Sequence, residues 1–137
     1  KIKTILSDVS DKGYVISIFM SPLDVHVNRA PMQGQVMKQE HVPGKFNPAY
    51  DFWDTVENEK NEIIIKGRYK IKIIQIAGIL ARRIESFVSV GDNVLKGQRV
   101  GLINLGSQVT IIVPIDVKPV VKKGERVKAG ESIIAKL

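Results

Sequence analysis

Two copies of one glycine-bounded pattern occupy the last third of this 137-residue chain. Residues 88–101 and 120–133 both contain G-[DE]-x-V-x-x-G, which begins at Gly91 in the first copy and at Gly124 in the second. Glycine adopts backbone angles that other residues avoid, so both glycines of the pattern predict turns. The valine between them is expected to fill the core. Turns at such short intervals leave room only for short strands.

Five upstream segments are rich in β-branched and other apolar residues, and each is expected to be extended: residues 14–20, 24–31, 32–40, 62–66 and 69–76. Gly67 and Arg68 predict a tight turn between the last two segments. In the last segment apolar residues alternate with Lys70 and Lys72, which predicts a half-exposed strand. Two prolines and a glycine predict a loop over residues 41–48, so His41 is interpreted as incidental.

The repeated glycine pattern resembles the hammerhead strands of biotinyl and lipoyl carrier domains and of other barrel-sandwich hybrid folds. We therefore expect one mainly β, barrel-sandwich-hybrid-like domain over residues 1–137, with short strands, Gly-rich turns and little helix. A carrier domain would need a lysine in a Met-Lys-Met or Asp-Lys-Ala setting, and neither tripeptide occurs. A non-catalytic binding or structural module with this fold stays open as the alternative to an enzyme.

The amino-acid composition excludes several kinds of active site and binding partner. The chain has no cysteine and two histidines, which excludes disulfides, thiol nucleophiles and a three-histidine zinc site. Its net charge of +7 favours anionic partners, but aromatic residues are only 6% and do not alternate with lysines, so nucleic acid is not expected. No apolar run is long enough for a transmembrane helix. Because the chain begins at Lys1, we expect an N-terminal segment of the full protein to be missing.

Four groups of residues follow one another in a recognisable order. Residues 19–31 read Phe-Met-Ser-Pro-Leu-Asp-Val-His-Val-Asn-Arg-Ala-Pro, and residues 43–46 read Pro-Gly-Lys-Phe. The third group is Asn-Glu-Lys-Asn at 58–61, with Gln-Ile-Ala-Gly at 75–78 and Ala-Arg-Arg-Ile at 81–84; the fourth is Gly-Leu-Ile-Asn-Leu-Gly-Ser at 101–107. In this order they resemble the phosphatidylserine decarboxylase family, especially its short bacterial and archaeal branch, which includes archaetidylserine decarboxylase.

The resemblance implies a proenzyme (zymogen) that cuts itself between Gly106 and Ser107. A serine hydroxyl can attack the preceding carbonyl when the peptide is strained and the charge is stabilised. The ester then undergoes β-elimination to dehydroalanine, which hydrolyses to a pyruvoyl group at residue 107. Gly106 has no Cβ to block this attack. Taken alone, Gly-Ser is also an ordinary turn pair.

The resemblance also implies the cofactor's use. The pyruvoyl carbonyl would form a Schiff base with the amine of a serine-headgroup phospholipid and act as the electron sink for loss of carbon dioxide. The product would be phosphatidylethanolamine or its ether-lipid analogue. His26 is the candidate acid that protonates the carbanion, and Asp24, of the same side-chain parity on an extended segment, is a candidate to orient the ring. The alternatives are a histidine packed on a strand and a turn carboxylate.

Other residues are candidates for holding the substrate. The guanidinium groups of Arg29, Arg82 and Arg83 suit the phosphodiester, although surface charge is the alternative. Asn28 and Gln75 are candidates for hydrogen bonds to the headgroup or to the cleavage site. A lipid substrate implies work at an anionic membrane surface, and we expect a peripheral or anchored location at the cytoplasmic face of the cell membrane. A homo-oligomer that completes the pocket across a subunit contact stays open.

Two departures from the family bear on self-cleavage. The family's upstream Pro-x-Asp-Gly segment is absent, and the acidic stretch at residues 7–11 does not match it. Either this sequence begins after that segment or another group does its work. Arg29 occupies the position at which the longer branch has a second histidine, and an arginine cannot act as a base at neutral pH. A relative that is not self-processed is the alternative reading.

Overall fold

A computed structural model of the chain describes residue 9 and residues 12–21, 27–45, 57–78, 84–103, 107–128 and 132–136. These residues contain strands β1 (Gly13–Met20), β2 (Val27–Arg29), β3 (Gly34–Val42), β4 (Lys60–Lys66), β5 (Lys70–Ala77), β6 (Ile84–Ser86), β7 (Asn93–Val94), β8 (Arg99–Ile103), β9 (Ser107–Pro114), β10 (Lys118–Pro119) and β11 (Ala135–Lys136). No helix occurs within the described ranges, which confirms the mainly β prediction.

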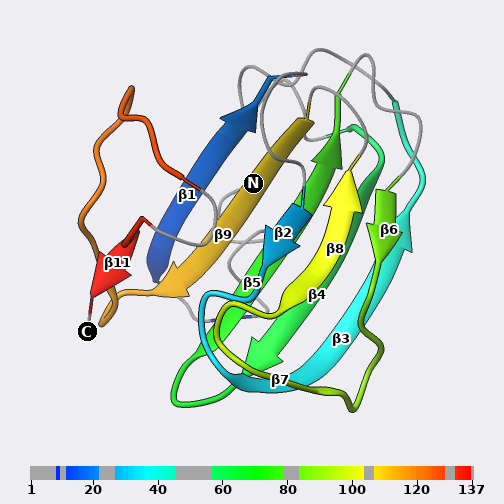
Figure 1. Ribbon diagram of the computed structural model, residues 1–137, viewed down its shortest axis with the longest axis horizontal. Coiled ribbons are helices and arrows are strands. Elements are labelled where there is room, and N and C mark those ends of the chain that lie inside the picture. The colour runs from blue at the N-terminus through cyan, green and yellow to red at the C-terminus, as the bar shows by residue number, and fades with distance from the viewer. Residues whose placement is uncertain are drawn as a thin grey trace.

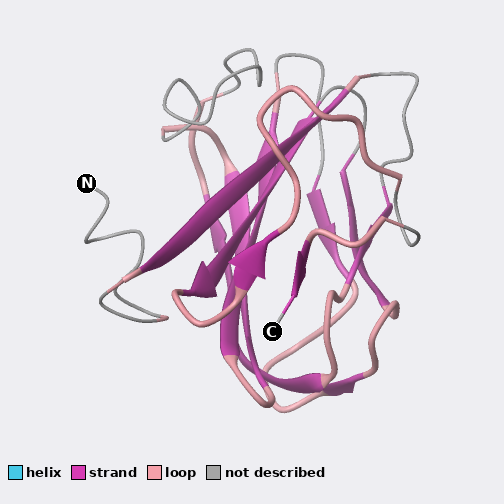
Figure 2. Ribbon diagram, turned by 90° about the vertical axis from the view of Figure 1, so that its left-hand side faces the viewer, coloured by secondary structure: helices cyan, strands magenta, loops and turns pink. Residues whose placement is uncertain are grey.

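The strands form two packed sheets and a small ribbon (Figure 1). An antiparallel six-stranded sheet has the order β1-β9-β5-β4-β3-β7, and a three-stranded sheet, β2-β8-β6, lies over it (Figure 2). Side chains from both sheets meet in one apolar core, in which Ile63 and Ile73 of the large sheet and Val100 and Ile103 of the small one are fully buried. β10 and β11 pair with each other beside β1.

The prediction of a half-exposed strand over residues 69–76 is wrong, because β5 is buried on both faces. β5 lies between β9 and β4 in the middle of the large sheet. Its outer face carries Ile74 and Ile76, which form a second apolar cluster with Ile112 and Val9. On the same face Lys72 is only 5% exposed, and its Nζ lies 2.8 Å from Glu62 Oε1. The alternating pattern predicts a solvent-exposed lysine, but Lys72 is paired inside the protein.

The two copies of the glycine pattern form matching turns. Gly91 and Gly124 both have left-handed backbone angles, with φ of 95° and 88°. The acidic residue that follows each glycine accepts a hydrogen bond from the backbone N–H three residues earlier; these pairs are Asp92 with Ser89 and Glu125 with Lys122. The valine of the first copy, Val94, is buried as predicted, whereas Val127 in the second copy is only half-buried.

Candidate processing site

The predicted cleavage position lies where three strands of the large sheet meet. Ser107 is the first residue of β9, and its backbone pairs with Met20 at the end of β1 and with Ala77 at the end of β5. Met20 is 7% exposed and Ala77 is fully buried. β9 is therefore held by neighbouring strands on both sides from its first residue onward, directly after the Gly106–Ser107 bond.

Several candidate residues lie outside the described part of the chain, namely Asp24, His26, Arg82, Arg83 and Gly106. Their roles stay predictions. The strand ends that flank them are described: β2 begins at Val27, β6 begins at Ile84 and β8 ends at Ile103. These ends lie on the same side of the sandwich as the start of β9, at the top of Figure 1. The topology therefore brings the strand ends that flank these candidates to one end of the molecule.

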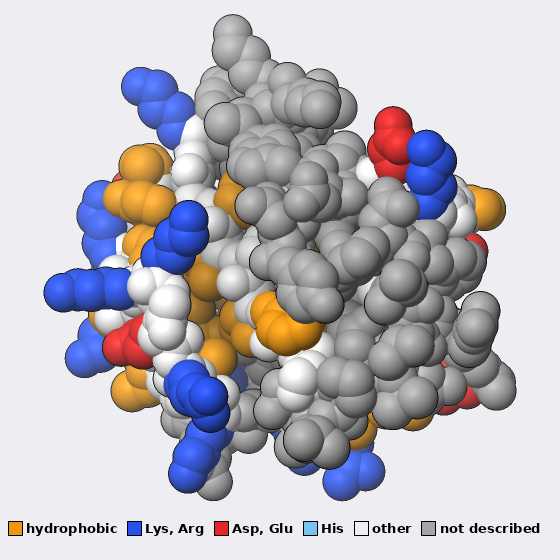
Figure 3. Space-filling view, turned by 90° about the horizontal axis from the view of Figure 1, so that it is seen from above, with side chains coloured by type: hydrophobic (Ala, Val, Ile, Leu, Met, Phe, Trp, Pro, Cys, Tyr) orange, Lys and Arg blue, Asp and Glu red, His pale blue; other side chains and the backbone are white. Residues whose placement is uncertain are grey.

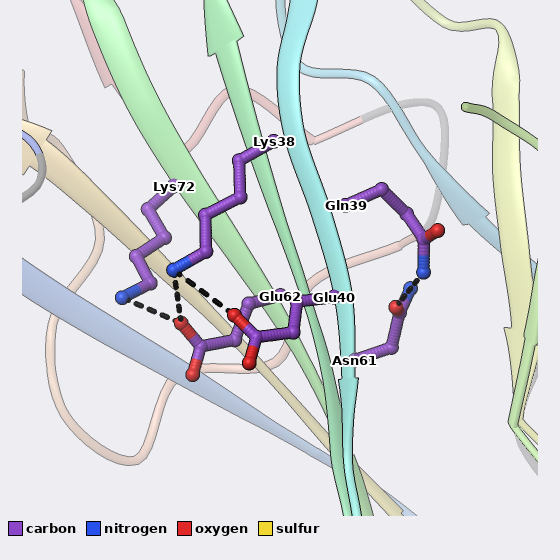
Figure 4. Close-up of polar contacts among 6 residues, drawn as sticks. All are labelled: Lys38, Gln39, Glu40, Asn61, Glu62 and Lys72. Carbon is purple, nitrogen blue, oxygen red and sulfur yellow. Dashed lines mark hydrogen bonds and ion pairs between the residues drawn. The ribbon is translucent and has the colours of Figure 1, made fainter. Parts of the chain in front are cut away.

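Asn28 and Gln75 are brought into direct contact. Gln75 Nε2 donates to Asn28 Oδ1 at 3.0 Å, which joins the two sheets through their side chains. Asn61 Nδ2 donates to Gln75 Oε1 at 2.8 Å, and Gln39 donates to Asn61 Oδ1 (Figure 4). At the other end, Asn28 Nδ2 lies 3.8 Å from the Met20 sulfur. We call Gln39, Asn61, Gln75 and Asn28 the amide chain.

The amide chain runs through the apolar core, and its inner members are almost inaccessible. Gln75 is 0%, Asn61 1% and Asn28 7% exposed. A neutral polar group at such a position costs free energy unless it is hydrogen-bonded, and each of these three amides has partners inside the protein. At its Asn28 end the amide chain contacts the side chain of Met20, whose backbone pairs with Ser107. It therefore connects the middle of the sheet with the processing position.

Asn58, for which the sequence predicts no individual role, is also fully buried beside the site. Its Nδ2 donates to the Ala77 carbonyl at 2.8 Å, and the Ala77 N–H donates to the Glu59 carbonyl at 3.0 Å. Both contacts fix the end of β5 next to Ser107. The available signal was the Asn-Glu-Lys-Asn sequence at 58–61, which contains two amides in one short segment.

Arg29 and His41 are backbone neighbours of the amide chain, since Arg29 follows Asn28 and His41 pairs with Asn61, but their side chains contact other groups. The Arg29 guanidinium donates to the Gly97 carbonyl at 2.8 Å, in the turn before β8, whereas Ile103 at the other end of β8 lies near the processing position. The nearby prolines predict a loop at His41, but this prediction is wrong because His41 lies in β3. Its Nε2 is 3.3 Å from the Glu59 carboxylate. The Pro-Gly pair begins only after β3 has ended.

A second polar group lies on the outer face of the large sheet. Thr110 Oγ1 donates to Gln108 Oε1 at 3.0 Å and lies 2.9 Å from Ser17 Oγ. Thr110 and Gln108 are buried, so β9 carries hydrogen-bonded polar side chains close to its start on this face.

Charges also gather on that outer face, away from the amide chain. Glu62 Oε1 lies 2.8 Å from Lys72 Nζ and 3.8 Å from Lys38 Nζ, and Lys38 reaches Glu40 as well (Figure 4). Nearby, burial lowers the pKa of Lys60 from its ordinary 10.5, with the Lys72 charge acting in the same direction and Glu62 opposing it.

Over the described residues no three histidine or carboxylate side chains are grouped to hold a metal ion. The same residues include no helix that could cross a membrane.

Comparisons with known proteins cover nearly the whole chain. Residues 1–135 match the family model described as phosphatidylserine decarboxylase. The chain is 49% identical over 125 residues to a putative archaetidylserine decarboxylase proenzyme of Methanothermobacter thermautotrophicus, a match that covers 90% of this chain and 56% of that protein. It is 48% identical over 124 residues to a phosphatidylserine decarboxylase proenzyme of Chlorobium phaeovibrioides, covering 90% of this chain and 57% of the relative.

A putative archaetidylserine decarboxylase proenzyme of Methanocaldococcus jannaschii is also 49% identical over 125 residues, which are 60% of its length. The chain therefore spans less than two thirds of the length of these curated relatives. No solved structure matches it significantly.

Proposed function

Because this chain belongs to the phosphatidylserine decarboxylase family, we propose that its protein removes carbon dioxide from a phospholipid with a serine headgroup. The reaction would use a pyruvoyl group that the protein makes from Ser107. One observation carries this proposal: Ser107 opens a strand that pairs with buried strand ends on both sides. The backbone from residue 107 onward is held in register on both sides, and self-cleavage requires a reacting backbone of fixed geometry.

The first step of the cleavage is an acyl shift that needs no other reactant, and the last step consumes one water molecule. The Ser107 hydroxyl oxygen bonds to the Gly106 carbonyl carbon, the carbon–nitrogen bond breaks, and the nitrogen receives the hydroxyl proton. β-Elimination of the resulting ester leaves a carboxylate on Gly106, and water then replaces the nitrogen of residue 107, which leaves as ammonia. The paired backbone of β9 fits the product, because the new amino terminus would still be held by β1 and β5.

The pyruvoyl group would supply an electron sink for decarboxylation. The protein must add a proton donor and a phosphate-binding group, and the proposal assigns these roles to residues predicted from the sequence. His26 would deliver the proton to the product carbon, with Asp24 orienting its ring. Arg82 and Arg83 would bind the phosphodiester, whereas the Arg29 guanidinium is held by the Gly97 carbonyl in the turn before β8.

The proposal places the protein at the cytoplasmic face of the membrane, as a peripheral or anchored protein. The net charge of +7 supports attraction to anionic headgroups, at about 1 kcal/mol for each lysine or arginine near the surface. Figure 3 looks onto the end of the molecule where β9 begins; on its left, exposed hydrophobic side chains lie among lysines and arginines. Such a mixed surface suits lipid headgroups over an apolar interior. A homo-oligomer that completes the pocket is part of the same proposal.

The mass of the full-length protein under denaturing conditions tests the chemistry. Cleavage would separate residue 106 from residue 107 and leave a downstream fragment lighter by one ammonia than a serine-ended peptide. Borohydride with an amine should trap its carbonyl, and Ser107→Ala should remain a single chain. An uncut wild-type protein would instead support the non-catalytic relative. Release of carbon dioxide from vesicles of serine-headgroup lipid then tests the substrate.

A further inference from the structure

The two backbone partners of Ser107 use their own hydrogen-bonding groups differently. On one side, the Ala77 N–H donates to the Glu59 carbonyl at 3.0 Å, and the Ala77 carbonyl accepts from Asn58 Nδ2 at 2.8 Å. Both of these partners lie on the β4 side of β5. Because the N–H and C=O of one residue point to the same side of a strand, Ala77 offers neither group to β9.

Ser107 therefore directs its backbone groups toward β1. Directly opposite residues of an antiparallel ladder either exchange both N–H···O bonds or exchange none, and the two kinds of pair alternate. Ser107 exchanges none with Ala77, so its N–H is paired with the Met20 carbonyl and its carbonyl with the Met20 N–H. The 2.9 Å contact of Ser17 Oγ with Thr110 Oγ1 fits this assignment, because side chains lie closest in pairs without backbone bonds.

The nitrogen of residue 107 thus lies between two buried residues, since Met20 is 7% and Ala77 0% exposed. Neither these two residues nor their chain neighbours carry a carboxylate. Self-cleavage would convert this nitrogen from an amide to an amine, and an α-amine with its ordinary pKa of about 8 is protonated at neutral pH. Burying that charge costs free energy unless a hydrogen bond stabilises it. The Met20 carbonyl is the acceptor that already faces this nitrogen.

We propose that the backbone carbonyl of Met20 binds the ammonium group that residue 107 acquires during self-cleavage. When the bond from the Gly106 carbonyl carbon to the nitrogen breaks, the nitrogen takes the hydroxyl proton, and a second proton from water makes it an ammonium. Its hydrogen bond to Met20 then becomes charge-assisted, and such bonds are about twice as strong as neutral ones. This contact stabilises the ester against return to the amide.

The same contact favours the step that follows. A positive charge on the nitrogen makes the α-hydrogen of residue 107 more acidic, and β-elimination removes that hydrogen. Meanwhile the Met20 N–H holds the Ser107 carbonyl, so residue 107 stays in the sheet when its bond to Gly106 is gone. The inference rests on the proposed function, because it concerns the same cleavage, and it adds a group that binds the nitrogen released in the first step.

The first experiment tests the hydrogen bond itself, without any reaction. In full-length Ser107→Ala protein, which cannot cut itself, hydrogen–deuterium exchange measured by NMR reports on the N–H of residue 107. Val109 occupies the equivalent position opposite Ile18 and serves as the internal reference. We expect residue 107, like Val109, to be protected by at least about 100-fold relative to an unstructured peptide. An unprotected N–H at residue 107 would overturn the inference.

The second experiment weakens the Met20 carbonyl and leaves every side chain in place. Glyceric acid in place of Ser21, introduced during translation, turns the Met20–Ser21 peptide bond into an ester, whose carbonyl is a poorer acceptor. We expect newly synthesised full-length protein to be cleaved about tenfold more slowly. Hydroxylamine, which cuts the ester intermediate, should release correspondingly less fragment, because less of the chain is present as ester.

Phenyllactic acid in place of Phe19 is the matched control. It weakens the Ile18 carbonyl in the same way, and by the alternation of the ladder this carbonyl meets Val109, two residues from the cleaved bond. In each variant the lost N–H belongs to residue 19 or 21 and points away from β9. Both variants should lose similar stability, but the Phe19 variant should be cleaved at close to the wild-type rate.

The outcomes distinguish the two proposals. If wild type is never cleaved, the proposed function fails, whatever the exchange experiment shows. If wild type is cleaved and the Ser21 variant is cleaved equally fast, the function stands and the role of the Met20 carbonyl is overturned. Equal slowing in both ester variants would overturn that role too, since a general weakening of the β1–β9 pairing would then explain it.

Discussion

The side-chain amide of Asn58 donates to the carbonyl of Ala77 at 2.8 Å, and Ala77 is the backbone partner of Ser107. Asn58, just before β4, therefore fixes Ala77 at the end of β5. Because Ala77 pairs with Ser107, the same contact also holds one side of the first residue of β9. The contact is fully buried, so water cannot replace it if the amide is removed.

Removing this amide should destabilise the protein. Asn58→Ala leaves the Ala77 carbonyl without its side-chain donor, and we expect a loss of about 1–3 kcal/mol in the free energy of unfolding, measured in urea. Asn93→Ala, at an exposed position in β7, is the control and should stay within about 0.5 kcal/mol of wild type. Similar values for both variants would show that the Asn58 contact contributes little.

A methyl group at position 101 should be poorly tolerated. In Gly101→Ala the new Cβ would meet Gln75 Nε2 at 2.2 Å and the Glu85 carbonyl oxygen at 2.6 Å, so we expect a loss of about 1–3 kcal/mol. Gly124→Ala offers a comparison, because it meets no atom within 4 Å and is strained only by its φ of +88°. Thermal unfolding should rank Gly101→Ala as the less stable variant. The reverse order would mean that the Gln75 side chain can move away without penalty.

The ion pair of Glu62 and Lys72 should respond differently to single and double substitution. Glu62→Leu removes the carboxylate that lies 2.8 Å from the buried Lys72 ammonium and should cost about 3 kcal/mol or more. The double variant Glu62→Leu/Lys72→Met replaces both charges by apolar groups and should recover most of that loss. Denaturant unfolding of Glu62→Leu, of Lys72→Met and of the double variant gives the coupling energy between the two residues. Additive losses would contradict the pairing.

The lowered pKa of Lys60 predicts how stability depends on pH. Between that lowered pKa and 10.5 the unfolded state binds a proton that the folded state has released, so this residue makes stability rise with pH across the window. At neutral pH the folded state carries the cost of a partly buried charge. Lys60→Met should therefore exceed wild type in stability at pH 7, and this advantage should shrink as the pH approaches 10.5. A pH-independent difference in melting temperature would contradict the assignment.

The sequence predicts the local structure well where one signal dominates. The apolar runs on either side of Gly67 and Arg68 predict the β4–β5 hairpin, and the structure pairs these strands throughout. Likewise, Gly91 and Gly124 predict the two matching turns, which form with left-handed backbone angles. Each of these features depends on a few neighbouring residues and needs no partner from elsewhere in the chain.

Features that depend on distant partners could not be predicted. The alternating pattern predicts a solvent-exposed Lys72, but Glu62 of the neighbouring strand pairs with it inside the protein. The sequence marks Asn28 and Gln75 as two independent candidates, yet they lie 47 residues apart and their contact depends on how the sheets stack. Gln39 gave no signal in the sequence, because an amide on a strand looks the same whether it faces water or another amide.

The position of β9 has a consequence for the life of the protein after cleavage. β9 lies inside the large sheet, between β1 and β5, so a cut before Ser107 would produce two polypeptides that share one core. Neither could bury its apolar residues alone. The mature protein would then be an obligate pair that forms once, from a single precursor, and mixing separately made halves should not be expected to restore it. Its supply in the cell would be set by synthesis of the precursor, since loss of either half would leave the other unfolded.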